Sequence, residues 1–184
     1  MRLFTAIDLP ERIRHKLAAT LNKLRPTAKI NWSPPANLHI TTKFIGEWDF
    51  DRMDELEAAL EAMPKPDPFE VHVRGVGYFP TPHSPRTLFA GVEAPDQLNQ
   101  LAAAIDSALQ PLGIERESRK YSPHLTLARL KSTGDLADLR AAVAALPVID
   151  FGSFTVDSFD LFESELTSNG SIYTKVAEFP FRQP

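Results

Sequence analysis

Two segments of the chain, 85 residues apart, each carry a histidine followed two positions later by a threonine: His39 with Thr41, and His124 with Thr126. Imidazole titrates near neutral pH, so of two histidines that face one substrate, one accepts a proton while the other donates one. A threonine hydroxyl donates one hydrogen bond, which suits a non-bridging oxygen of a phosphate. The paired motifs therefore indicate general acid and base chemistry.

Each motif has the pattern of a half-buried strand. A strand directs alternate side chains to opposite faces, so each histidine shares a face with its threonine. Ile40 and Thr42 in the first motif, and Leu125 and Leu127 in the second, are predicted to face a core. A single strand histidine is more often structural, but two in equivalent positions favour the catalytic interpretation.

Composition excludes several other kinds of site. The chain has no cysteine, which excludes disulfide scaffolds, thiolate metal sites and cysteine nucleophiles. Neither motif has further ligands at metal spacing, which argues against a metal site, and no serine elbow accompanies them, which argues against a serine nucleophile. The other three histidines are predicted to be surface residues without a role: His15, His72 and His83.

Length and charge limit the class of protein. A chain of 184 residues can bury one good core or two small lobes that share a cleft. No apolar run is long enough for a bilayer, and segment 1–8 is too short for a signal peptide, so we expect a cytoplasmic protein without membrane contact. The net charge of -4 argues against non-specific coating of nucleic acid but leaves room for a local phosphate site.

The two halves of the chain resemble each other at an offset of 85 residues, as they would after an internal duplication. Segments 3–10 and 88–95 are similar strands that end in proline, and a strand at 69–73 is matched by one at 154–158. The alternative to a duplication is chance similarity between elements of the same kind, but the paired motifs favour two pseudo-symmetric lobes. We therefore predict one bilobal domain over 1–184, with approximate repeats 1–85 and 86–170 and a final strand at 171–180.

Apolar residues three or four positions apart predict four helices. The first pair follows the proline-ended strands, and the second pair follows the motifs. Proline-rich segments 64–68 and 80–85 are expected to be loops, as is the turn-rich segment 163–170. The helix stripes are Ile13, Leu17, Leu21 and Leu24; Leu98, Leu101, Ile105 and Leu109; Met53, Leu56, Leu60 and Met63; and Leu136, Leu139, Val143 and Leu146.

Across 1–10, 38–47, 123–129 and 163–173 the sequence resembles the 2H phosphoesterase superfamily, whose name refers to two His-x-Thr motifs. The resemblance is greatest to its RNA 2',3'-cyclic phosphodiesterase branch, also called 2'-5' RNA ligase. It implies an α+β fold of two lobes, each an antiparallel sheet backed by helices, with the active-site cleft between them. One departure is Thr42, where the branch usually has leucine; it points to the core and should affect stability more than chemistry.

The resemblance also implies a reaction. The family hydrolyses a ribose 2',3'-cyclic phosphate to a 2'-phosphomonoester without metal or nucleotide cofactor. It implies that His39 is the proton donor, that His124 is the proton acceptor, and that Thr41 and Thr126 stabilise the charge that develops on the phosphate. The near-symmetry of the motifs means that the residues alone do not say which histidine is the acid.

Four further residues are candidates for substrate binding. Lys43 is predicted to share the face of His39 and to neutralise phosphate, or else to be a solvated lysine at a strand end. Strand alternation places Arg129 on the core face, but it lies at the end of its strand. Its guanidinium there either curls around the sheet edge to reach phosphate or pairs with an acid. Arg119 and Tyr121 precede the second motif and are weaker candidates for phosphate contact and base stacking.

Three functions stay open on these grounds. The first is hydrolysis of RNA 2',3'-cyclic phosphate ends, with tRNA fragments as one class of partner and reverse 2'-5' ligation as a second activity. The second is a module that binds nucleotide or phosphate without turnover. The third is hydrolysis of a small cyclic phosphate such as ADP-ribose cyclic phosphate. We expect a monomer, although no residue pattern reports the oligomeric state.

Overall fold

The computed structural model describes residues 1–131, 134–147 and 149–183. Within these ranges, no helix has the length and apolar character needed to cross a membrane. The strands are β1 (Arg2–Ile7), β2 (Asn31–Trp32), β3 (Ile40–Glu47), β4 (Phe69–Pro80), β5 (Pro85–Glu93), β6 (His124–Arg129), β7 (Asp150–Val156), β8 (Ser158–Thr167) and β9 (Gly170–Pro180). The α-helices are α1 (Glu11–Leu24), α2 (Met53–Ala62), α3 (Asp96–Leu109) and α4 (Ala137–Ala145).

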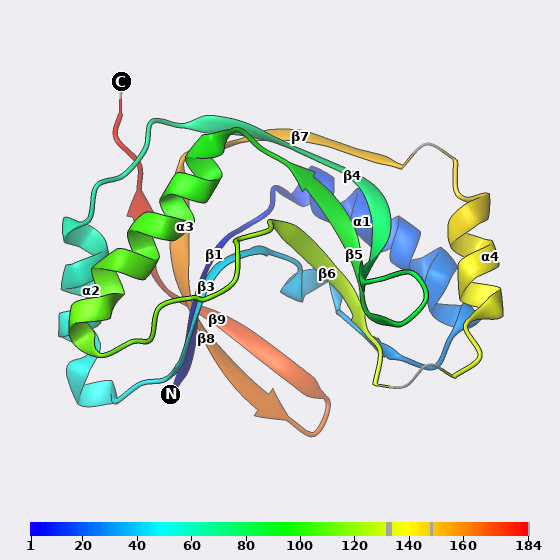
Figure 1. Ribbon diagram of the computed structural model, residues 1–184, viewed down its shortest axis with the longest axis horizontal. Coiled ribbons are helices and arrows are strands. Elements are labelled where there is room, and N and C mark those ends of the chain that lie inside the picture. Colours follow the sequence, from blue (N-terminus) through cyan, green and yellow to red (C-terminus); the bar gives the residue numbers. More distant parts are fainter. Residues whose placement is uncertain (132–133, 148, 184) are drawn as a thin grey trace.

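The strands form two antiparallel sheets. Sheet A has the strand order β3-β1-β8-β9, and sheet B has the order β2-β6-β5-β4-β7. Helices α2 and α3 contact sheet A, whereas α1 contacts β7 of sheet B and packs against α4 (Figure 1). The predicted α+β class, with two antiparallel sheets backed by helices, is confirmed.

The two repeats exchange elements between the sheets. Helix α1 follows β1 of sheet A in the chain but packs on sheet B, and α3 follows β5 of sheet B but contacts β3 of sheet A. The strands that carry Phe69 and Phe154 lie side by side in sheet B, because β7 pairs directly with β4 and places Phe154 opposite Val71. Each sheet therefore contains strands from both predicted repeats and contacts a helix that follows a strand of the other sheet.

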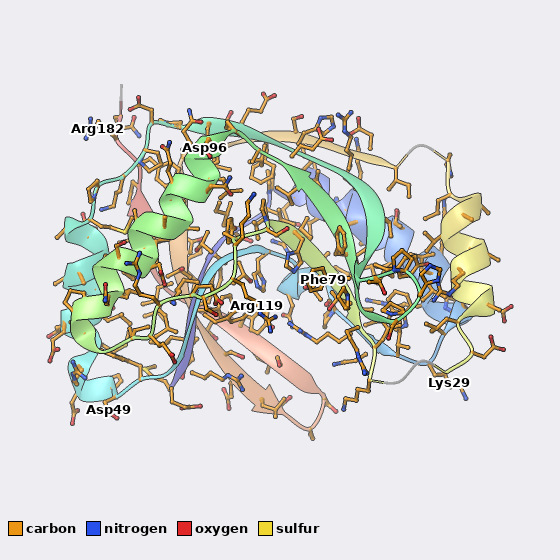
Figure 2. The ribbon with its side chains drawn as sticks, viewed as in Figure 1. Lys29, Asp49, Phe79, Asp96, Arg119 and Arg182 are labelled. Carbon is orange, nitrogen blue, oxygen red and sulfur yellow. The ribbon has the colours of Figure 1, made fainter. Side chains whose placement is uncertain are left out.

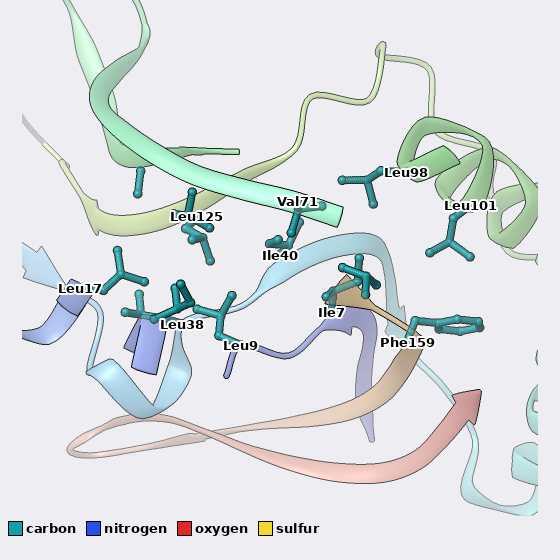
Figure 3. Packing of buried hydrophobic residues seen from close by; sticks show 14 of the residues in the cluster. Ile7, Leu9, Leu17, Leu38, Ile40, Val71, Leu98, Leu101, Leu125 and Phe159 are labelled. Carbon is teal, nitrogen blue, oxygen red and sulfur yellow. The ribbon is translucent and has the colours of Figure 1, made fainter. Parts of the chain in front are cut away.

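Most positions of the predicted apolar stripes are buried in the core, whereas Val143 and Leu146 of the fourth stripe are half-buried. The buried residues of α1 and α3 include all eight predicted positions, and Ile40 and Leu125 have no exposed surface. Figure 3 shows these two residues in the same apolar layer as Leu38 and Val71. The residue between histidine and threonine in each motif thus anchors its strand in the core, which holds the histidine on the opposite side.

Thr42 also faces the core, as predicted. It is 6% exposed, and its hydroxyl shares a 2.7 Å hydrogen bond with the hydroxyl of Thr5 on β1. A buried hydroxyl destabilises a protein chiefly when it has no partner. The Thr5 hydroxyl therefore offsets the cost of a polar residue at this position.

Candidate active site

Each motif histidine is anchored through the same ring nitrogen. Nδ1 of His39 lies 2.6 Å from the carbonyl oxygen of Asn37, and Nδ1 of His124 lies 2.8 Å from that of Ser122. A carbonyl only accepts hydrogen bonds, so Nδ1 carries the proton in both rings. Nε2 is therefore the atom that each neutral imidazole leaves free to accept a proton.

The His39 ring lies against aromatic side chains of sheet A. Its centroid is 4.8 Å from that of Phe4 and 5.2 Å from that of Tyr173, which meets it edge-on. The Phe162 ring is stacked relative to it, with the centroids 6.3 Å apart. Nε2 lies 2.9 Å from the hydroxyl oxygen of Thr41. The first motif is thus a histidine in an apolar recess with one hydroxyl on its reactive nitrogen.

Burial changes the protonation of this histidine. Removal of the ring from water lowers the pKa of His39 to about 4; the Asn37 carbonyl and Asp8 oppose the shift, and Arg14 and Arg129 add to it. In the free protein at neutral pH, the His39 imidazole is therefore uncharged.

The lowered pKa predicts a pH-dependent stability. Above pH 6.5 the imidazole is neutral in the folded and unfolded states. Between pH 6.5 and 4 only the unfolded chain binds the proton, so the free energy of unfolding falls by up to about 3 kcal/mol. Urea unfolding at pH 7.5, 5.5 and 4 measures this loss, which should be smaller in His39→Gln but unchanged in the exposed variant His15→Gln. Equal losses in all three proteins would contradict the half-buried, neutral His39.

His124 lies in a more open environment than His39. His124 is exposed to solvent. The aromatic ring of Phe89 meets its ring in a T-shaped arrangement, with the two ring centroids 5.9 Å apart. Thr126, the other motif residue, is half-buried on the same face of β6. The two motifs share their anchoring but differ in solvation, which breaks the symmetry that the sequence suggests.

A β-bulge follows each motif threonine. In β3, Ala6 lies opposite Thr41 and Thr5 lies opposite Lys43, so Thr42 is the extra residue. In β6, Phe89 lies opposite Thr126 and Leu88 lies opposite Ala128. A bulge places two residues against one and reverses the alternation of faces beyond it. Strict alternation counted from each histidine therefore predicts the wrong face for residues beyond its threonine.

The bulge in β3 corrects the prediction for Lys43. This residue does not share the face of His39 but points to the core side, where it is 6% exposed. Its ammonium group donates to the Asp106 carboxylate of α3 at 2.6 Å and to the Glu115 carbonyl at 2.7 Å. Lys43 is therefore neither a phosphate ligand nor a solvated lysine, and both interpretations offered for it are wrong.

Removal of this lysine should destabilise the fold. Lys43→Ala leaves the Asp106 carboxylate without its main partner, and breaking a buried pair costs about 3–5 kcal/mol of unfolding free energy. Urea unfolding measures the effect. Arg116→Ala is the control, because Arg116 reaches the same carboxylate at 3.3 Å from a largely exposed position and should matter far less. A loss below about 1 kcal/mol in Lys43→Ala would contradict the buried pair.

The bulge in β6 also changes the place of Arg129. It brings the arginine opposite Thr87 and onto the face of Thr126, rather than the core face that parity predicted. The side chain is exposed and makes no ion pair or hydrogen bond with the residues that the structure describes. Its charge contributes to the lowered pKa of His39, so Arg129 lies within electrostatic reach of the first motif. The residue that occupies the equivalent position in β3, 85 residues before Arg129, is Phe44, and it is 64% exposed.

The two residues before the second motif differ from each other. Arg119 is exposed on the segment between α3 and β6, as labelled in Figure 2. Tyr121 is half-buried against the core, and its hydroxyl donates a 2.7 Å hydrogen bond to the Thr41 carbonyl. The prediction of phosphate contact or base stacking by Tyr121 is therefore wrong, because its ring is packed and its only proton donor is engaged.

A pocket of about 550 Å³ adjoins His39. Asp8 and Arg14 are among the residues that line it, as are Tyr173 and Lys175 of β9. Its volume is in the range of small-molecule sites. Among the described residues, no three histidine, cysteine, aspartate or glutamate side chains gather as metal ligands.

The aromatic residues around the histidines were missed at the level of sequence. Phe4 and Phe89 lie 85 residues apart, like the histidines that they contact. That spacing was a usable signal, because it assigns one aromatic neighbour to each motif. Phe162 and Tyr173 come from β8 and β9, and no spacing in the sequence links those strands to His39.

The arrangement of paired histidines can be compared with known proteins. A profile of the 2'-5' RNA ligase superfamily matches residues 9–167, which include both motifs. The chain belongs to this superfamily. Among its relatives, the RNA 2',3'-cyclic phosphodiesterase of Methanothermobacter thermautotrophicus is 33% identical over 97% of this chain and 98% of its own. The protein of that name from Thermus thermophilus is 34% identical over 99% of this chain and 91% of its own.

Solved structures of superfamily members share the fold. TT0787 of Thermus thermophilus superposes with a TM-score of 0.81 at 33% identity, covering 99% of this chain and 98% of its own. E. coli LigT complexed with 3'-AMP superposes with a TM-score of 0.82 at 27% identity and the same coverage. The two-lobed arrangement is therefore that of the superfamily over the whole chain.

Proposed function

We propose that the protein hydrolyses the 2',3'-cyclic phosphate at the end of an RNA to a 2'-phosphomonoester. The observation that carries the proposal is the pair of imidazoles anchored alike through Nδ1, each with a threonine on its own face. The relatives named RNA 2',3'-cyclic phosphodiesterase support the substrate class. Ends of cleaved RNA, such as tRNA fragments, are the partners that this chemistry suits.

The proposed reaction needs two proton transfers. Nε2 of His124 accepts a proton from water as the water oxygen attacks phosphorus, and Nε2 of His39 donates a proton to the 3' oxygen as the phosphorus–oxygen bond breaks. The hydroxyls of Thr41 and Thr126 donate to the non-bridging oxygens, where negative charge develops. Arg129 supports the same oxygens with its guanidinium.

The acid role of His39 requires a change of protonation on binding. In the free protein its pKa is about 4, so it carries no proton on Nε2 at neutral pH. A cyclic phosphate is an anion, and an opposite charge beside a buried imidazole raises its pKa. Substrate binding should therefore take up a proton at His39.

Proton uptake tests the assignment of acid and base. Calorimetry of 2',3'-cyclic nucleotide binding to the His124→Ala variant, in buffers of different ionisation enthalpy, should show uptake approaching about one proton per site at pH 7. The variant His39→Gln with His124→Ala should show none. Binding without proton uptake in the first variant would assign the base role to His39 and overturn the assignment proposed above.

The proposed activity itself is tested with an oligonucleotide that ends in a 2',3'-cyclic phosphate. Incubation with the protein in EDTA should convert the end to a monoester. Substrate that stays intact would refute the proposal, and tight binding without turnover would favour a binding module instead. A 5'-hydroxyl in place of the attacking water would give a 2'-5' linkage by the same proton transfers, so ligation is assayed in the same incubation by adding such an acceptor.

A further inference from the structure

Two side-chain hydroxyls link the motifs crosswise. The hydroxyl of Tyr121, three residues before His124, donates to the carbonyl of Thr41 at 2.7 Å. The hydroxyl of Ser33, six residues before His39, donates to the carbonyl of Thr126 at 2.9 Å. The segment that leads into each motif therefore holds the threonine of the other motif.

Backbone contacts strengthen the Ser33 side of this arrangement. The backbone amide of Ser33 donates to the Leu127 carbonyl at 2.9 Å, and Trp32 pairs with Ala128 as part of β2. The segment before the first motif is thus an edge strand on the strand that carries the second motif.

The Tyr121 side has a different support. Lys43 donates to the Glu115 carbonyl, and Asp106 accepts from the backbone amide of Glu117 at 3.0 Å. These bonds hold the start of the segment before the second motif close to β3. Burial raises the pKa of the Tyr121 phenol, so its hydroxyl keeps the proton that it donates to the Thr41 carbonyl.

The cross-links matter because β3 and β6 belong to different sheets. No strand pairing joins β3 to β6 among the described residues, so the ladders do not fix the position of one motif relative to the other. The Thr41 backbone carries the hydroxyl that lies 2.9 Å from Nε2 of His39. A shift of the Thr41 carbonyl would therefore also move the group that contacts the reactive nitrogen.

We propose that Tyr121 and Ser33 are positioning residues that set the register between the two motifs, so that both Nε2 atoms address one phosphate. The inference rests on the proposed acid and base function. Misplacement of a catalytic group by about 1 Å costs up to about a hundredfold in rate, so a hydroxyl far from the phosphate can affect turnover.

The test compares Tyr121→Phe and Ser33→Ala with Thr27→Val. The Thr27 hydroxyl donates to the Leu24 carbonyl at 2.6 Å at the end of α1, so this control removes a similar bond away from the motifs. We expect kcat on a 2',3'-cyclic nucleotide to fall about tenfold or more in the first two variants, with KM within about twofold. Thr27→Val should leave both constants within about twofold of the parent.

A second readout does not depend on activity. The imidazole ¹⁵N resonances of the free protein should shift at His39 Nε2 in Tyr121→Phe and at His124 in Ser33→Ala, but not in Thr27→Val. A loss of kcat equal to that of the control, or explained by a smaller folded fraction in circular dichroism, would overturn the positioning role, as would unchanged imidazole resonances. A parent protein without turnover would instead refute the proposed function, and the resonances would still decide the positioning role.

Discussion

His39→Ala and His124→Ala are each expected to lower kcat on a cyclic-phosphate substrate by about 10²–10⁴-fold. Each substitution removes one of the two proposed proton transfers, at a ring whose Nδ1 is held by a backbone carbonyl and whose Nε2 is the proposed reactive atom. Single-turnover and steady-state assays at pH 7 measure the loss. The matched control is His83→Ala, because His83 is exposed and lies outside both motifs and outside the lining of the pocket beside His39.

The double variant should lose little more than either single variant. In the proposed mechanism the two histidines act on one phosphate in one step, and residues that act as a unit have strongly non-additive effects on kcat. Single variants with the activity of the parent would refute the mechanism. Two independent losses that multiply in the double variant would show that the histidines serve separate sites.

Thr126→Val and Thr41→Val are expected to lower kcat by about 10²–10³-fold, because each removes one donor to the charge that develops on the phosphate. Valine has the shape of threonine but lacks the hydroxyl. The corresponding serine variants should recover most of the activity. Thr155→Val, on an exposed position of β7, provides the control and should leave kcat unchanged.

The threonine variants also separate two effects. Thr41 contacts His39 directly at 2.9 Å, so its valine variant should alter the pH dependence of kcat as well as its size. Thr126 has no hydrogen bond from its hydroxyl to another described residue, so its variant should change only the size. Valine variants with parental kcat would limit both threonines to a structural role.

The fold was largely predictable because its elements have clear periodicity. The stripes in α1 and α3 are buried as predicted, and Ile40 and Leu125 face the core as strand alternation requires. The exchange of α1 and α3 between the sheets was not predictable. It depends on which sheet a helix packs against after a connection, and both choices bury the same apolar stripe.

The face of the strand on which each side chain lies was predictable up to each threonine and not beyond. His39, Thr41 and their counterparts follow strict alternation, but one extra residue in each strand then reverses the faces. No glycine or proline in the sequence indicates these bulges. Strict alternation therefore placed Lys43 in the cleft and Arg129 toward the core. Tyr121 was misjudged for another reason, since its partner, the Thr41 carbonyl, belongs to the other motif.

The position of the phosphate in the product tests the central claim most directly. An RNA oligonucleotide with a 2',3'-cyclic phosphate end is incubated with the protein, and the product is examined by ³¹P NMR against authentic 2'- and 3'-phosphates. Two histidines acting in line from opposite sides, with His39 protonating the 3' oxygen, predict the 2'-phosphate alone. A 3'-phosphate, or a mixture of the two, would contradict this account.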